Sequence, residues 1–291
     1  MFAIEASNTS DLCRRIVTQN NLADKVTVLA GRAEDIQLPE NLKADILISE
    51  WMGFYLLHES MLNSVIVARD RFLSPDGIMV PSAATLYMCP VAMKEYHHEH
   101  FNFWKDVYGF DLSPAQVHAR QARIAQPQIL TINPASCLAE PQMILNIELM
   151  YIGVEDLRNI FASPTFVINK NDLLHGFAYW FDVEFDSGGE KRVVLSTSPS
   201  SPDTHWHQTV VILPDTLLVS VDEQVSCLIS LTQDSKNTRR YNITIEIPEE
   251  EDESEDEHDK ENDMEGDAST EASMNFTHNL QELIKNAMTS K

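Results

Sequence analysis

The stretch "ADILISEWMGFYLLHES", residues 44–60, joins an apolar run to a loop that carries two glutamates. The almost continuous apolar run over 44–50 predicts a strand in a parallel sheet that is covered on both faces. Glu50 and Glu59 then bound a loop that is otherwise mostly apolar and aromatic. Because ligands of open α/β sheets bind beyond the carboxyl ends of the strands, the sequence predicts a binding site at this loop.

Outward from this stretch, strand and helix patterns alternate over the first 80 residues. Apolar, β-branched runs predict strands at 2–6 and 25–31, and a turn followed by a strand at 74–81. Helical spacing of apolar residues predicts helices over 8–20 and from Met61 to Phe72. This βαβ order predicts part of a doubly wound α/β sheet over residues 1–80.

After Pro81 the pattern changes to many short strands, which is typical of an antiparallel barrel or sandwich. We predict a β-rich domain over residues 81–247. The predicted strands cover 84–91, 142–150, 164–169, 173–185, 207–213, 216–221, 224–231 and 241–247. Residues 93–127, rich in histidine and aromatic side chains, are too many for a hairpin loop and predict a separate protrusion.

The composition excludes several classes of protein. The chain has 291 residues and a net charge of −24, which disfavours binding to nucleic-acid phosphates and favours a basic protein partner. No apolar run is long enough to predict a membrane span. Four scattered cysteines without a CxxC pair predict reduced thiols and no metal site.

Acidic residues are concentrated after residue 247. We predict that residues 248–291 form a largely disordered acidic tail, because they contain too few apolar residues to build a core. Apolar residues at helical spacing predict a short helix over 275–288, although a fraying tail is the simpler interpretation.

The pair of glutamates limits the chemistry of the predicted site. Two carboxylates held close together repel unless a cation lies between them. A guanidinium fits, because it is planar, permanently charged and able to pair with carboxylates in a bidentate way. Glycoside hydrolysis or metal binding also uses paired carboxylates, so these alternatives stay open from the residues alone.

Four motifs in order resemble the protein arginine N-methyltransferase family, and the similarity covers about residues 1–247. "SEWMG" with "HESML" resembles the family's double-glutamate loop. "SPDTHWHQTVVIL" (201–213) resembles its Thr-His-Trp loop, and "FWKDVYGFDLS" (103–113) the start of its dimerisation arm. "FAIEAS" and "GRAEDIQLP" resemble its second and third strands.

The resemblance implies a fold and an activity. The expected fold is a partial doubly wound sheet of the seven-strand methyltransferase type, followed by an antiparallel β-barrel with an inserted helical dimerisation arm. The expected activity is transfer of a methyl group from S-adenosyl-L-methionine to arginine nitrogens. Implied partners are arginine-rich proteins such as histones, and a second copy of the chain through arm 93–127. The implied location is the nucleus, the cytoplasm or both.

The resemblance also implies residue roles. Glu50 and Glu59 are the expected catalytic clamp, with His205 bracing it. Glu5 and Glu34 are the expected cofactor-binding acids. The implied substrate pocket contains Met61 and Trp51, and Met61 indicates the type I branch, which forms asymmetric dimethylarginine. Local motifs resemble both subgroup six and subgroup two of the family.

One family feature is missing from this sequence. The family has a glycine-rich turn after a first strand, and no GxGxG motif occurs here. Two interpretations stay open, namely a truncated form of an active enzyme and a non-catalytic scaffold or hetero-dimerising protein. A different seven-strand methyltransferase is a third interpretation, which the double-glutamate loop disfavours.

Overall fold

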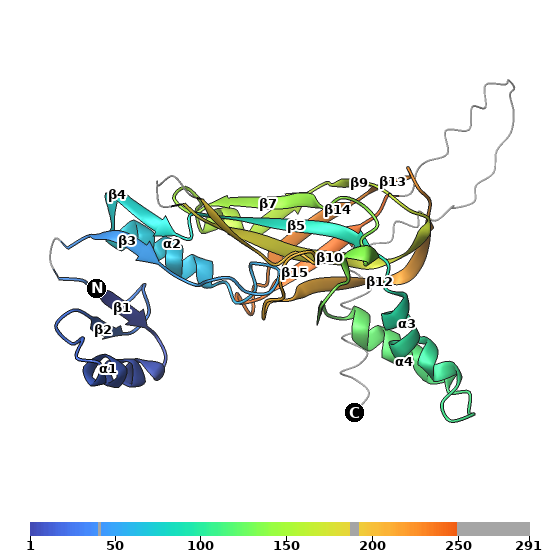
Figure 1. Ribbon diagram of the computed structural model, residues 1–291, viewed down its shortest axis with the longest axis horizontal. Helices are drawn as coiled ribbons and strands as arrows, with labels where there is room; N and C mark the ends of the chain where they lie inside the picture. The colour runs from blue at the N-terminus through green and yellow to red at the C-terminus, as the bar shows by residue number, and fades with distance from the viewer. Residues whose placement is uncertain (40–41, 187–191, 249–291) are drawn as a thin grey trace, which may run out of the picture.

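A computed structural model describes residues 1–39, 42–186 and 192–248, and Figure 1 shows its elements along the chain. The expected alternation of strand and helix over the first 80 residues is present. Its elements are β1 (Phe2–Glu5), α1 (Thr9–Gln19), β2 (Thr27–Ala30), β3 (Ala44–Ile48), α2 (Met61–Phe72) and β4 (Leu73–Val80). The predicted helix at 275–288 lies outside the described residues.

The N-terminal strands form two separate parallel pairs. β1 pairs with β2, and β3 pairs with β4, but within the described ranges neither pair bonds to the other. The Arg71 guanidinium of α2 joins them, since it donates to the carbonyl oxygens of Ala33, Glu34 and Ile36. The predicted cover on both faces of β3 is wrong, because Ile46 and Ile48 are 53% and 74% exposed. In the described ranges β3 pairs with β4 alone, and the face of β3 that carries Ile46 and Ile48 is not covered.

The rest of the described chain is antiparallel, as expected. One sheet has the order β6-β12-β10-β5-β7, with β11 on β10; a second has the order β15-β14-β8; β13 pairs with β9. The strands are β5 (Ala83–Val91), β6 (Gln128–Leu130), β7 (Gln142–Glu148), β8 (Asn159–Ala162), β9 (Thr165–Val167), β10 (Asp172–Phe185), β11 (Val193–Ser196), β12 (Gln208–Val219), β13 (Gln224–Ser226), β14 (Leu228–Gln233) and β15 (Tyr241–Glu246). Short 3-10 helices η2 (Pro134–Ser136) and η3 (Glu155–Leu157) interrupt the loops.

An apolar core lies between these sheets and continues into the loop after β3. Phe177, Tyr179 and Phe181 of β10 are at most 1% exposed and contribute to the same cluster as Leu56 and Leu57. The loop that carries the two glutamates is therefore anchored in the core of the β-rich part. Because this packing removes a large apolar area from water, it is the main source of the loop's stability.

Two predicted strands, 207–213 and 216–221, are one strand, β12, which extends from Gln208 to Val219. Pro214 lies inside it. Pairing with β10 is irregular there, because Leu174 is opposite Leu217 whereas Gly176 is opposite Ile212. The extra residues accommodate a proline that has no N–H to donate to the ladder, so the strand bulges and does not end.

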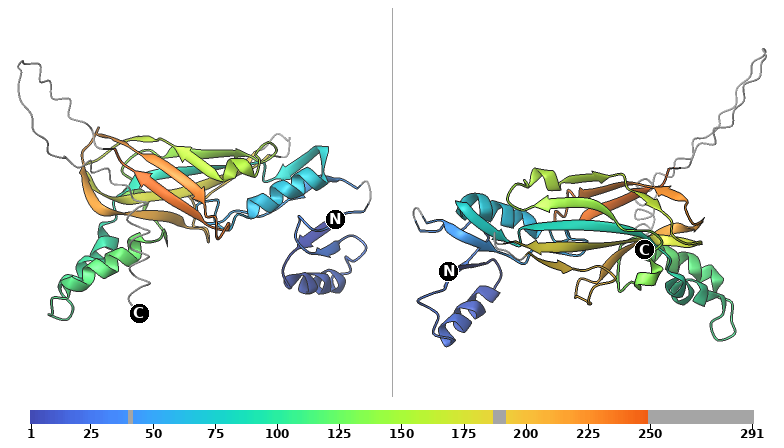
Figure 2. Two further views of the ribbon diagram at one scale, coloured as in Figure 1. Left: turned by 180° about the vertical axis from the view of Figure 1, so that it is seen from behind. Right: turned by 45° about the horizontal axis from the view of Figure 1, so that its top comes forward.

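Helices form the protrusion expected over 93–127. α3 (Lys94–His100), η1 (Asn102–Lys105) and α4 (Ser113–Ile124) extend from the β-rich part at the end opposite to β1 and β2 (Figures 1 and 2). At its base the guanidinium carbon of Arg120 lies 5.3 Å from the ring centre of Phe101. At its tip Tyr108 is 98% exposed. We call this segment the arm.

The Tyr179 hydroxyl offers a test of the core. It is fully buried and no hydrogen-bond partner for it is present among the described residues. Because a buried polar atom without a partner costs free energy, Tyr179→Phe is expected to keep or raise the free energy of unfolding, by up to about 1 kcal/mol.

Urea unfolding measures this change. Tyr55→Phe is the matched control, because the Tyr55 hydroxyl has a partner, His58 Nδ1, at 3.0 Å. That control is expected to lower the free energy of unfolding by about 1 kcal/mol. A larger loss for Tyr179→Phe than for Tyr55→Phe would contradict the assignment of the Tyr179 hydroxyl as unpaired.

Candidate active site

The loop between β3 and α2, residues 49–60, is held in a compact shape by its own backbone. Gly53 N donates to Leu56 O at 3.0 Å, Leu57 N donates to Tyr55 O at 2.8 Å, and His58 N donates to Phe54 O at 3.1 Å. Tyr55 and Leu56 adopt positive φ angles of 42° and 68°. L-residues adopt this region at a cost, which the burial of Leu56 and Leu57 offsets.

Gly53 is the position at which the loop closes on itself. A Cβ atom placed there would lie 2.0 Å from the carbonyl oxygen of His58. No side chain relieves such a clash, because the contacted atom belongs to the backbone. Only glycine fits, and the close approach sets the shape of the loop between the two glutamates.

Glu50 lies just beyond the carboxyl end of β3. The strand ends at Ile48, and Ser49 N still donates to Val80 O of β4 at 3.1 Å. Glu50 is exposed, and its Oε1 accepts a hydrogen bond from Met52 N at 3.1 Å. One carboxylate oxygen is thus fixed by the loop, and the carboxylate is available to a cation at the end of the strand.

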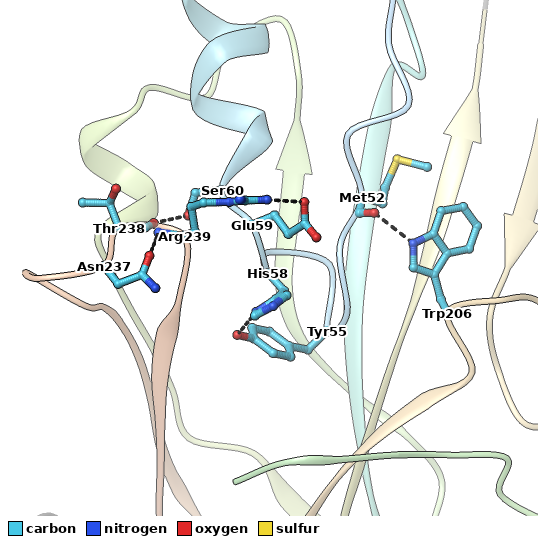
Figure 3. Close-up of polar contacts among 9 residues, drawn as sticks. All are labelled: Met52, Tyr55, His58, Glu59, Ser60, Trp206, Asn237, Thr238 and Arg239. Atoms are coloured by element: carbon cyan, nitrogen blue, oxygen red, sulfur yellow. Dashed lines mark hydrogen bonds and ion pairs between the residues drawn. The ribbon is translucent and has the colours of Figure 1, made fainter. Parts of the chain in front are cut away.

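Glu59 is held by the hairpin between β14 and β15, residues 234–240 (Figure 3). Its backbone N donates to Arg239 O at 2.7 Å, and its Oε2 accepts from an Arg239 guanidinium nitrogen at 2.7 Å. The next residue, Ser60, donates from its hydroxyl to Thr238 O at 2.5 Å. The side chains of Glu59 and Arg239 are 57% and 67% exposed, so the ion pair itself adds little stability.

Trp206 fixes the loop from the other side. Its Nε1 donates to Met52 O at 2.9 Å (Figure 3). Its ring packs edge-on against Phe181, with ring centres 5.4 Å apart. His205, the expected brace, is exposed and its ring centre lies 3.9 Å from that of Trp206. No hydrogen bond from His205 to the loop is found in the described ranges. On this side of the loop the bracing contact comes from Trp206, the neighbour of His205.

His58 lies between Glu50 and Glu59 in the sequence, and its imidazole is uncharged near neutral pH. Its Nδ1 is 3.0 Å from the Tyr55 hydroxyl. Burial lowers the pKa of His58 below its usual value, with a smaller opposing effect from Glu59. An uncharged imidazole does not compete with a cationic ligand for the carboxylates.

Glu34 and Glu5 are the expected cofactor acids. Glu34 lies in the loop after β2, and Glu5 is the last residue of β1. Glu34 Oε1 accepts a hydrogen bond from the Ser64 hydroxyl of α2 at 2.6 Å. Partial burial acts to raise the pKa of Glu34, but the Ser64 hydroxyl and Arg32 outweigh it and the pKa is lowered. Glu5 Oε1 accepts from Ser7 N at 2.7 Å, which lowers its pKa. Both acids are thus ionised near neutral pH.

The two expected substrate-pocket residues differ in exposure. Met61, the first residue of α2, is 48% exposed, whereas Trp51 is 2% exposed. The buried Trp51 therefore supports the loop by packing in the core, whereas Met61 is accessible to a ligand beside Glu59.

The structure brings Glu50, Trp51, Glu59 and Met61 together on one loop and helix start. Ser64, one turn into the same helix, links them to Glu34. Among the described residues, Glu5 is connected to this group through the pairing of β1 with β2. No set of three histidine, cysteine, aspartate or glutamate side chains in the described ranges is placed to hold a metal ion. Sequence reasoning missed the hairpin 234–240, whose turn-rich "DSKNTRR" predicts a loop but not its contact with Glu59.

Comparison with solved structures defines the class of protein first. The Trypanosoma brucei PRMT1 enzyme-prozyme heterotetrameric complex with AdoHcy has a TM-score of 0.76, with 30% identity over 86% of this chain and 77% of that one. A crystal structure of PRMT6 has a TM-score of 0.69, with 29% identity over 85% of this chain and 84% of that one. The fold is that of the methyltransferases.

Sequence comparison defines the family. Residues 82–251 match the arginine methyltransferase oligomerization subdomain. A probable protein arginine N-methyltransferase 6 of Arabidopsis thaliana is 37% identical over 84% of this chain and 64% of its own length. The protein arginine N-methyltransferase 1 of Schizosaccharomyces pombe is 37% identical over 84% of this chain and 70% of its own length. The chain belongs to the protein arginine N-methyltransferase family and spans about two thirds of these relatives.

Proposed function

We propose that this protein methylates arginine side chains of proteins, using S-adenosyl-L-methionine, and that it forms mono- and asymmetric dimethylarginine. The observation that carries the proposal is the guanidinium of Arg239, which already lies 2.7 Å from Glu59 at the candidate site. This ion pair supports the proposal that Glu59 also binds the guanidinium of a substrate. Arginine-rich proteins such as histones are the proposed substrates, and the acidic chain favours their approach.

Glu50 and Glu59 are proposed to orient the substrate guanidinium. Two carboxylates at its edges hold one terminal nitrogen in a fixed direction and draw the positive charge away from that nitrogen. Fixing a reactant in this way supplies a large part of a rate enhancement. The guanidinium has a pKa of about 12.5–13.8, so proton loss accompanies or follows methyl transfer, with a glutamate as the acceptor.

Glu5 and Glu34 are proposed to bind the cofactor's ribose hydroxyls and adenine. Their residue type and placement fit this role, because both are ionised acids at the ends of neighbouring parallel strands. One oxygen of Glu34, Oε2, accepts no hydrogen bond in the described ranges, although Arg32 Nε lies 3.4 Å from it as an ion pair. The cofactor supplies an electrophilic methyl group on a sulfonium.

The arrangement of domains and the assembly are part of the proposal. Residues 1–80 contribute to the cofactor-binding sheet, residues 81–247 form the antiparallel barrel, and the arm pairs two copies of the chain. The match to an oligomerization subdomain over residues 82–251 supports an oligomer. The proposed location is the nucleus, the cytoplasm or both, where histones and other arginine-rich proteins occur. No helix in the described ranges is long and apolar enough to cross a membrane.

A second candidate is a non-catalytic partner protein built on the same fold. The observation that favours it is the lack of strand pairing between β1-β2 and β3-β4 in the described ranges, which leaves Glu5 on a different strand pair from the clamp loop. Such a protein would form mixed oligomers without transferring methyl groups.

A methylation assay on this chain distinguishes the two candidates. The chain is incubated with S-adenosyl-L-methionine and an arginine–glycine-rich peptide, and the peptide mass is measured. A gain of one or two methyl groups is expected for the proposed enzyme. An unmodified peptide, with cofactor binding absent in calorimetry, would favour the partner protein.

Arg239 is expected to compete with the substrate for Glu59. Arg239→Ala is therefore expected to lower the KM for an arginine peptide by about two- to fivefold, the range that an exposed ion pair allows. kcat is expected to stay unchanged, because Arg239 leaves Glu59 before the substrate binds. Arg158→Ala, which removes an exposed ion pair with Glu155 elsewhere, is the matched control. A raised KM would show instead that Arg239 holds Glu59 in place.

A further inference from the structure

A pocket of about 440 Å³ lies away from the double-glutamate loop. Tyr87 of β5 and Trp180 and Asp182 of β10 line it, together with Glu140 and Ser196. Along β10, Tyr179 and Phe181 face the core that also holds Trp206. Because successive side chains of a strand point to opposite faces, Trp180 and Asp182 lie on the other side of the sheet. The pocket and the clamp are therefore separate sites.

Asp182 is the polar centre of this pocket. Its backbone lies in the ladder between Thr85 of β5 and Ser196 of β11. Its Oδ1 is buried and has no hydrogen-bond partner in the part of the chain that the structure describes. A carboxylate oxygen held inside the protein without a donor is costly, and the positive charge of a cation bound in the pocket would offset this cost.

Glu140 adds a second acid at the pocket, on an exposed residue. Within the described ranges, no lysine or arginine forms an ion pair with Glu140 or with Asp182. The nearest paired acid on the same face of β10 is Glu184, whose partner is Arg192. Two acids without a cation thus line one pocket in a protein that carries a net negative charge.

Two aromatic side chains complete the lining. Trp180 is 6% exposed and Tyr87 is half-buried, so both are fixed by packing. Aromatic faces attract cations, and a planar guanidinium also stacks on them. An aromatic wall beside a carboxylate is the chemistry that binds an arginine side chain better than the more strongly hydrated ammonium of lysine.

We propose that this pocket binds an arginine side chain of a basic polypeptide, as a docking site separate from the clamp. The volume fits one such side chain, since ligand pockets start at about 300 Å³. The inference goes beyond methyl transfer, because it requires neither cofactor nor reaction. A polypeptide with two arginines would be held at the pocket by one of them.

Binding of a labelled peptide tests the proposal in a chain whose clamp is disabled by Glu50→Gln and Glu59→Gln. The probe is a fluorescent arginine–glycine peptide at low ionic strength, and anisotropy gives the Kd. Adding Asp182→Asn is expected to raise the Kd about tenfold, because a charge-assisted hydrogen bond is lost. Replacing the arginines of the peptide with lysines is expected to weaken binding as well.

Glu148→Gln is the matched control, because it removes one acid from β7, outside the residues that line the pocket. It is expected to change the Kd less than twofold. Glu140→Gln is the second test variant, since a change on an exposed residue leaves the fold intact if Asp182→Asn unfolds the chain. If neither Asp182→Asn nor Glu140→Gln raises the Kd, the proposal that this pocket binds an arginine side chain is wrong. If the lysine peptide binds equally well, the proposed preference for arginine is wrong.

Discussion

Glu50→Gln is expected to reduce methyl transfer to an arginine peptide by about 100-fold or more, with little change in stability. The substitution keeps the size of the side chain but removes its charge. The amide oxygen still accepts from Met52 N, so the loop keeps its shape. The guanidinium loses one of the two carboxylates that align it, and misalignment of a reactant by about 1 Å costs about 100-fold in rate.

Initial rates by mass spectrometry, in a preparation that transfers methyl groups, measure this effect. Glu148→Gln removes an acid of the same type outside the candidate site and is expected to leave the rate unchanged. If Glu50→Gln keeps the rate within twofold of the unmodified protein, the clamp assignment fails. A loss of thermal stability in Glu50→Gln would mean that the carboxylate has a structural role.

Gly53→Ala is expected to have the second large effect, on both the fold of the loop and the reaction. The added Cβ would lie 2.0 Å from His58 O, so the backbone between Glu50 and Glu59 must open. Such overpacking lowers the free energy of unfolding by about 3 kcal/mol. The spacing of the two carboxylates changes with it, and methyl transfer is expected to fall about 100-fold.

Gly153→Ala is the matched control, because its Cβ would meet only the side chain of Asp156 at 3.1 Å. It is expected to be tolerated with a small loss of stability. Urea unfolding and the methylation rate are measured for both variants. Equal stability of Gly53→Ala and Gly153→Ala would show that the loop closes without the close contact.

Residues within one short stretch were the best predicted from the sequence. The apolar run 44–50 and the spacing of Met61 to Phe72 predict β3 and α2, although β3 ends at Ile48, two residues before the end of the predicted strand. The strand Gln208–Val219 is predicted from the sequence as two strands, because the bulge opposite Leu174 depends on pairing with β10 that the sequence does not reveal. Local patterns predict elements well where no irregular pairing occurs.

Long-range contacts at the site could not be predicted from the residues. Nothing in "DSKNTRR" indicates that Arg239 reaches Glu59, because the pairing depends on how β14 and β15 meet the loop. The Trp206 contact with Met52 depends in the same way on packing against Phe181. Nor does the sequence reveal that β3 is exposed on one side, since that depends on which strands pair.

The bracing of residues 49–60 also fixes when the site can form during synthesis. The bonds to Trp206, Thr238 and Arg239 join positions 154, 178 and 180 residues apart in the chain. Closing loops of this length is slow compared with forming local helices and turns. The ribosome must therefore complete most of the β-rich part before Glu59 has its backbone partner. The two carboxylates cannot be set in place on a nascent chain, and the binding site is among the last parts of the molecule to fold.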